Sequence, residues 1–498
     1  MDRLLRSVVV SWLACTTLVG CVELDGAAVS GRELGLAEGD AQLRLVHASA
    51  TSGAFDIYLG DGEAPRWAAI TFASVTDYVA VPAGAVQIAV CPAGAAASTA
   101  PLFALGTSLA EGDRVTLVAD GVVGSSVEAV KFRVQAVAEA FAPAEPGTLR
   151  VRFVQASHAL QNAGYDVGAD GTVEVAGLAP FATSEPAGLA VPASPKPVQL
   201  AVHAGTPNRR LTAFTLPATA LTEGEELLVI PTGVPAVVPR DPRGLALLLV
   251  GRGTLALVRQ NPTLYLLPAI PNAAGVDLHL FGALLGGVQV ADEAGFGSLT
   301  AVQVPANRSG YGLLALDGAA DADTAGAPLA FALTGTLEAG ERYLVVASGF
   351  RGDCASARPG VQVAVIRDQF ATAQTASGRL RAVAAAADAP ALDLGRFPPG
   401  DNTPFTSIAG LDGLAYGATS LAEGTEIPAV PLNPALRPTG TDTAIRFRFG
   451  SLASVDRVLA VIAGAHAPAA GDVGPRLVMV KAANSGAWTA QVVAPPQQ

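Results

Sequence analysis

Three short anchors recur in the same order along the chain and mark four copies of one unit, and this repetition constrains the fold more than any other feature. The first anchor is an apolar strand pattern followed by an Asp between two apolar residues. That Asp stands in every copy, at Asp56, Asp166, Asp277 and Asp393. An arginine occupies matching places in the opening strand of three copies, and Tyr265 replaces it in the third; these arginines are Arg44, Arg152 and Arg381.

Two further anchors follow the first along the chain. The second is Val81-Pro82-Ala83-Gly84, echoed by residues 191–194 and 304–307, and we expect the fourth copy to lack it. The third runs from a leucine to a glycine with constant spacing, at residues 109–121, 221–233, 337–349 and 452–464. Each copy then ends in one more strand, over residues 130–137, 245–258, 361–366 and 477–480.

These units of roughly 110 residues, with short strands between turns, predict an all-β protein of four antiparallel β-sandwiches, each of about seven strands and Ig-like or transthyretin-like. A small β-barrel is the alternative. The predicted domains are residues 41–143, 147–261, 262–375 and a divergent copy at 378–495. Because a unit of this length can bury its own core, we expect four separate beads that fold independently.

The anchors of the first copy, His47-Ala48-Ser49 and Val81-Pro82-Ala83-Gly84 among them, resemble the bacterial extracytoplasmic domain-of-unknown-function family 4397. The second and third copies fit less closely, and the fourth fits poorly in its middle. The resemblance implies a sandwich fold and a location in the cell envelope. It implies no activity, ligand or catalytic residue.

The N-terminus has the order of an export signal, with charged residues before an apolar run that is too short to span a bilayer. The run ends in Leu18-Val19-Gly20-Cys21, which resembles the lipobox of bacterial lipoproteins. The resemblance implies that residues 1–20 are cleaved between Gly20 and Cys21, and that acyl chains such as palmitate on Cys21 anchor the protein. Residues 21–40 then form a tether, and Val22 in place of an aspartate favours the outer membrane.

Net charge and cysteine content limit the partners and crosslinks that we expect. A formal net charge of −12 gives no electrostatic reason to approach phosphate backbones, so we expect no nucleic acid partner. Of the four cysteines, Cys91 and Cys354 lie in different copies, and we expect two separate thiols rather than a bridge.

Residues with catalytic or metal-binding chemistry are few. The five histidines do not recur from copy to copy, which favours ordinary strand or turn roles; they are His47, His158, His203, His279 and His466. The recurring aspartates could form a repeated ligand site, but we expect them to bond backbone amides or the strand arginines. Three loop acids could hold calcium and Arg351-Gly352-Asp353 spells an integrin-binding tripeptide, although neither pattern is specific; the acids are Asp317, Asp321 and Asp323.

The sequence therefore predicts a non-enzymatic, lipid-anchored envelope protein, without metal or cofactor, that adheres or binds ligands through loops. An envelope protein or a polysaccharide is the expected partner. The alternative is a structural spacer or scaffold of the envelope. A hydrolase with a site made only of carboxylates is the third hypothesis.

Overall fold

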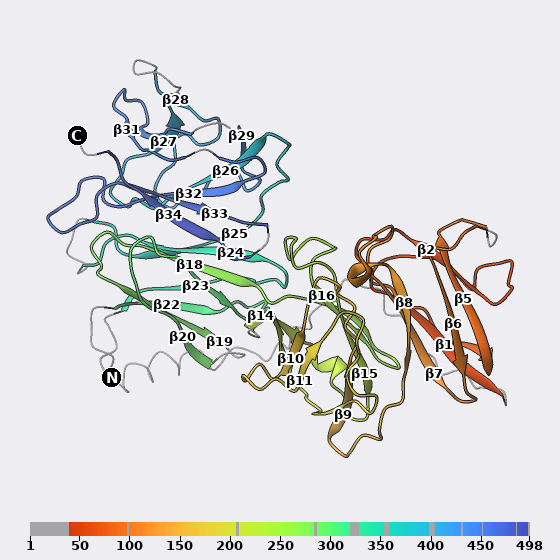
Figure 1. The fold of residues 1–498 in the computed structure, drawn as a ribbon. Helices are drawn as coiled ribbons and strands as arrows, with labels where there is room; N and C mark the ends of the chain where they lie inside the picture. Colours follow the sequence, from red (N-terminus) through yellow and green to blue (C-terminus); the bar gives the residue numbers. More distant parts are fainter. Residues whose placement is uncertain are drawn as a thin grey trace.

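We describe a computed structural model of the chain, in which almost all regular structure is β (Figure 1). The described residues are 39–96, 99–205, 209–282, 286–318, 328–352, 358–397, 404–429, 432–450, 452–484 and 486–496. The proposed signal segment, Cys21 and the tether to residue 38 lie outside them, as does Cys354. In the part that is described, no helix is long and apolar enough to cross a membrane.

The strands fall into four sets. The first repeat contains β1 Asp40–His47, β2 Phe55–Leu59, β3 Trp67–Ile70, β4 Val79–Pro82, β5 Gly84–Pro92, β6 Phe103–Leu109, β7 Arg114–Asp120 and β8 Arg133–Ala138, with a short η1 turn at Glu128–Val130. The second repeat contains β9 Thr148–Phe153, β10 Ala163–Val167, β11 Val175–Leu178, β12 Leu189–Pro192, β13 Val198–Ala204, β14 Arg209–Leu216, η2 Ala218–Ala220, β15 Glu226–Thr232, β16 Ala246–Val250 and β17 Leu255–Arg259.

The second half of the chain continues the series. The third repeat contains β18 Thr263–Ala269, β19 Val276–Gly282, β20 Gly286–Ala294, β21 Thr300–Gln303, β22 Gly312–Asp317, β23 Pro328–Leu333, β24 Arg342–Ser348 and β25 Gln362–Arg367. The fourth contains β26 Ser377–Ala384, β27 Leu392–Arg396, β28 Thr406–Ser407, β29 Thr425–Pro428, β30 Pro434–Pro438, β31 Ile445–Arg446, β32 Arg457–Ala463, β33 Arg476–Lys481 and β34 Thr489–Val493.

All four repeats share one two-sheet topology, which confirms the predicted sandwich class. In the first repeat, one sheet has the order β4-β1-β7-β8 and the other has the order β3-β2-β5-β6. The same order returns in the other repeats, where β17 and β34 each extend the first sheet by a strand. The first sheet is mixed rather than purely antiparallel, because β1 pairs with β7 in parallel, as do β9 with β15, β18 with β24 and β26 with β32.

The leucine-to-glycine anchor has a physical cause in this topology. Its leucine is buried in every repeat, and its glycine directly follows the seventh strand with a positive φ of 96°, 85°, 116° and 84° at Gly121, Gly233, Gly349 and Gly464. A Cβ at Gly121 would lie 2.5 Å from the carbonyl oxygen of Lys131, which leads into the eighth strand. Only glycine combines this backbone conformation with so close an approach.

Two details differ from the sequence prediction. The fourth repeat does carry the second anchor, as Ile427-Pro428-Ala429, because Pro428 pairs with Ser377 just as Pro82 pairs with Asp40. Residues 245–258 do not form one strand; β16 and β17 pair as a hairpin whose turn contains Gly251 and Gly253. A long apolar run does not reveal a turn inside it, so the pattern alone could not separate these two strands.

The prediction of separate beads is wrong, because the repeats pack in pairs. Residues of the first sheets of repeats 1 and 2 form one buried cluster, which includes Val46 and Val118 from the first and Leu228 and Val250 from the second. A larger cluster joins repeats 3 and 4 in the same way, with Leu267 and Val461 at 0% exposure. Each first sheet is therefore apolar on both faces, one against its own partner sheet and one against the neighbouring repeat.

Candidate functional site

The four recurring aspartates lie at one structural position, on the second strand of each repeat. Each carboxylate accepts the backbone N–H of a residue with positive φ in the segment that follows the strand. The pairs are Asp56 with Ala69 at 2.6 Å, Asp166 with Gly171 at 3.0 Å, Asp277 with Glu293 at 2.7 Å and Asp393 with Gly413 at 2.9 Å. The shared bond holds an irregular backbone segment against the strand, which explains why the residue type recurs.

Most of these carboxylates accept further hydrogen bonds. Asp56 also accepts the N–H of Gly94 at 2.8 Å. Asp393 accepts hydrogen bonds from Arg437 at 2.9 Å and from Thr439 at 2.8 Å. Burial by itself would raise the pKa of Asp393, but these hydrogen bonds and that of Gly413 outweigh it, so the pKa lies below its ordinary value.

One aspartate also belongs to a cluster of acids. Carboxylate oxygens of Asp166, Asp170 and Glu174 lie within 4.8 Å of one another, a grouping that could hold a cation through oxygen ligands. Each carboxylate already accepts a backbone N–H, however: Asp170 from Thr172 at 2.8 Å and Glu174 from Val167 at 2.8 Å. These bonds give the three acids a role in the turn itself.

One of our alternatives expected the strand arginines to pair with the recurring aspartates. They instead form contacts between neighbouring repeats. Arg44 donates to the carbonyl of Gly251 in the second repeat, at 2.8 Å. Arg152 donates in the opposite direction, to the carbonyl of Ala138 in the first. Arg381 of the fourth repeat donates to the carbonyl of Arg367 at 2.8 Å. The matching Tyr265 stacks on Trp488 of the fourth repeat with ring centroids 4.3 Å apart, so this strand position serves the repeat interface in all four copies.

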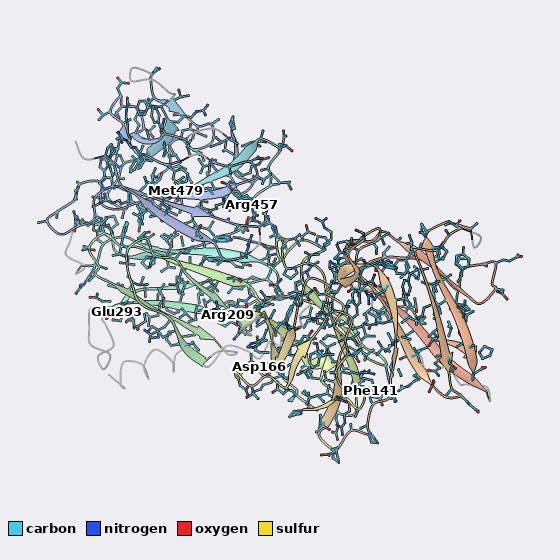
Figure 2. All side chains as sticks on the ribbon, in the orientation of Figure 1. Phe141, Asp166, Arg209, Glu293, Arg457 and Met479 are labelled. Atoms are coloured by element: carbon cyan, nitrogen blue, oxygen red, sulfur yellow. The ribbon has the colours of Figure 1, made fainter. Side chains whose placement is uncertain are left out.

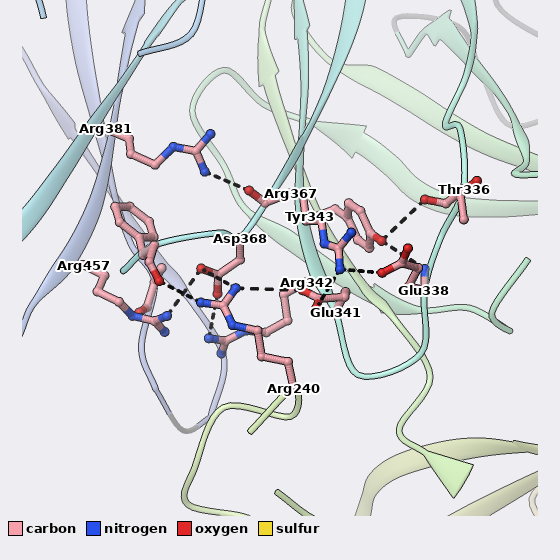
Figure 3. Close-up of polar contacts among 12 residues, drawn as sticks. Arg240, Thr336, Glu338, Glu341, Arg342, Tyr343, Arg367, Asp368, Arg381 and Arg457 are labelled. Carbon is pink, nitrogen blue, oxygen red and sulfur yellow. Dashed lines mark hydrogen bonds and ion pairs between the residues drawn. The ribbon is translucent and has the colours of Figure 1, made fainter. Parts of the chain in front are cut away.

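A buried acid lies at each interface, one between repeats 1 and 2 and the other between repeats 3 and 4. Glu139, just after β8, accepts hydrogen bonds from Arg44 at 2.9 Å and from Tyr78 at 2.7 Å. Its counterpart after β25 is Asp368, which is 1% exposed (Figure 3). The Asp368 carboxylate lies 2.9 Å from Arg342 of its own repeat, 3.4 Å from Arg457 of the fourth and 3.7 Å from Arg240 of the second. Three repeats thus meet at one carboxylate.

Electrostatics at this junction follow from its burial. Desolvation lowers the pKa of Arg457 to about 10, and the neighbouring Asp368 carboxylate opposes that shift. Arg457 also donates to the carbonyl of Ala482 at 3.0 Å. Sequence reasoning missed Glu139 and Asp368, although each is an acid two residues beyond the last predicted strand of an odd-numbered repeat.

The remaining candidates have local roles in the structure. His47 is buried, stacks on Phe55 with centroids 4.2 Å apart, and burial lowers its pKa to about 4. The guanidinium of Arg351 lies 2.6 Å from the carboxylate of Asp317, while Asp321, Asp323 and Asp353 are outside the described residues. Cys91 is a buried free thiol whose pKa is raised by burial and by the nearby Asp56.

The geometry defines a protein of tandem β-sandwich repeats with polar and apolar interfaces between them. Residues 41–163, which span the first repeat and the start of the second, match the family described as Domain of unknown function (DUF4397). No curated protein matches the chain.

Two solved structures have limited similarity. One is a product complex of the multi-modular glycogen-degrading pneumococcal virulence factor SpuA, at 10% identity and a TM-score of 0.13, covering 57% of this chain and 37% of that one. The other is the Bacillus anthracis TIE protein, at 9% identity and a TM-score of 0.14, covering 82% of this chain and 68% of that one. The chain thus spans just over a third of the length of the SpuA structure.

Proposed function

We propose that the chain is a non-enzymatic protein of the cell envelope, anchored to the outer membrane through acylated Cys21, that serves as a stiff scaffold for its loops. Those loops contact a neighbouring envelope protein or a polysaccharide. The observation that supports this function is the pair of buried interfaces between repeats, joined at Asp368 by Arg240 of the second repeat. Loops on repeats that are fixed to one another keep constant distances, whereas beads on flexible linkers do not.

Stiffness is measured with spin labels on exposed positions of adjacent repeats, after Cys91 and Cys354 have been replaced by Ser. A scaffold gives one narrow distance distribution for each labelled pair. Broad distributions between repeats 1 and 2 or between repeats 3 and 4 would exclude the scaffold.

Anchoring is tested separately. Cys21→Ala should abolish labelling by a fatty-acid analogue and release or misprocess the protein, because the thiol that carries the lipid is gone. Cys91→Ala is the control, since this buried thiol should leave labelling unchanged. Equal labelling of the Cys21→Ala variant and the unaltered chain would rule out the anchor.

A further inference from the structure

The outer face of the second sheet of repeat 3 carries large apolar side chains in solvent. Phe331 and Leu333 on β23 are 64% and 60% exposed, and Phe281 on β19 is 37% exposed. Leu314 lies on the same face, on the strand β22 between β19 and β23. It pairs with His279 of β19 on one side and with Phe331 of β23 on the other. We call these four residues the third-repeat face. Figure 1 shows this sheet on the side of repeat 3 that points away from repeat 4.

The other repeats do not repeat this feature. The positions that match Phe331 in the shared strand register are Ala104, Thr215 and Arg446, which pair with Ala89, Gln199 and Ala435. Small or polar residues therefore stand where the third repeat has an exposed phenylalanine. The shared fold does not require an apolar residue there, so the face has a cause specific to the third repeat.

Glycines beneath the rings keep the third-repeat face level. A Cβ at Gly312 would lie 2.9 Å from the Phe331 ring, and one at Gly287 would lie 2.9 Å from the Phe281 ring. Both rings therefore lie close over the backbone of a neighbouring strand. A level apolar sheet surface is suited to sheet-on-sheet packing, which is how this chain covers its other apolar outer faces.

Charges of opposite sign border the two ends of the face. Exposed Asp292 and Glu293 lie at the end of β20 that pairs with Val276. Exposed Arg308 lies in the loop before β22, which begins at Gly312 opposite Phe281 at the other end of β19. Figure 2 shows Glu293 at the end of the sheet farther from the second repeat. A two-fold axis that lies in the interface and runs perpendicular to the strands would place the acidic end of one copy on the basic end of the other.

We propose that a second copy of this chain covers the third-repeat face, through a two-fold axis that brings Phe331 and Leu333 of both copies into contact. His279, which pairs with Leu314, is the one titratable side chain among the described residues at the centre of the face, and opposite charges border the two ends, so the face is complementary to itself. The contact does not depend on the lipid anchor, and its failure leaves the scaffold proposal unaffected.

Sedimentation equilibrium of the full chain in density-matched detergent tests the contact. The unaltered chain should form a reversible dimer, and Phe331→Asp or Leu333→Ser should raise the dissociation constant at least about tenfold. Leu421→Asp is the matched control, because Leu421 of the fourth repeat is 65% exposed and lies outside the face. Far-ultraviolet circular dichroism confirms that each variant remains folded. A monomeric unaltered chain, or equal weakening by Leu421→Asp, would overturn the proposal.

Charge exchange tests the orientation. Glu293→Arg and Arg308→Glu should each weaken the dimer, and the double variant should recover it. Failure of the double variant to recover the dimer would contradict the two-fold arrangement. Retention of a monomeric unaltered chain on polysaccharide beads, lost in Phe331→Asp, would also overturn the proposal and assign the face to a polysaccharide.

Discussion

At the scale of single residues, the place of a residue in the shared fold explains its contacts between repeats, which its residue type alone does not. Arg44, Arg152 and Arg381 differ in their partners, yet all three reach across a repeat boundary from the same strand position. Tyr265 does so by stacking. The replacement of arginine by Tyr265 in the third repeat thus preserves an interface contact with different chemistry.

Asp56 offers a test of the aspartate position. Asp56→Asn should destabilise the first repeat by about 1.5–3 kcal/mol, because the carboxylate accepts two backbone N–H groups and the variant removes its charge. The melting temperature should fall by several degrees. Thermal unfolding is followed at Trp67, buried in that repeat, with Trp12 and Trp488 replaced by Phe.

Exposed Asp61 is the matched control, and Asp61→Asn should leave the melting temperature unchanged. A chelator should not affect the unaltered chain. If a chelator lowered its melting temperature to that of Asp56→Asn, the aspartate would be a cation ligand instead.

His47 predicts a pH dependence of stability. Burial lowers its pKa from 6.5 to about 4, so the unfolded chain binds a proton more readily than the folded one between these values. Stability should therefore decrease as the pH falls from 6.5 towards 4, by about 3 kcal/mol from this group. His47→Gln, which supplies the residue found at Gln155 in the second repeat, should flatten this part of the profile measured at Trp67. An unchanged slope in the variant would disprove the assignment.

At the scale of strands and turns, the equal spacing from leucine to glycine in the four repeats reflects a close backbone approach. Gly121→Ala should cost about 3 kcal/mol or more, because the new methyl group would meet the carbonyl oxygen of Lys131 at 2.5 Å in a left-handed backbone conformation. Gly112→Ala is the control: its φ is 78°, but nothing lies within 4 Å of the new Cβ. Strain alone should then cost about 1 kcal/mol. Urea unfolding followed at Trp67 measures both, and equal losses would contradict the close approach.

At the scale of the whole molecule, the repeats should fold as pairs. Fragment 41–261 should unfold in one cooperative transition, because it retains the apolar cluster between repeats 1 and 2. Fragment 41–143 exposes Val46, Val118 and Val137 and loses the Gly251 carbonyl that accepts from Arg44, so it should melt at a lower temperature and bind a hydrophobic dye. Calorimetry of both fragments measures the difference. Equal melting temperatures for repeat 1 alone and in the pair would show that the interface contributes nothing.

The sequence by itself determined the sandwich class and the recurring anchors, because alternation, turn glycines and spacing are local properties of the chain. The alternation in each strand and the run from Leu109 to Gly121 predict a unit without reference to its neighbours. The bonding of Asp56 to backbone amides was likewise one of two options that the pattern suggested.

Only the tertiary structure decided how the units meet. An apolar residue on the outer face of a strand has the same sequence pattern whether a neighbouring repeat covers it, as at Val46, or solvent does, as at Phe331. Asp368 similarly resembles any loop acid in sequence, and its partners Arg240 and Arg457 are distant along the chain. Contacts between sheets of different repeats depend on long-range packing, which periodicity within one strand does not encode.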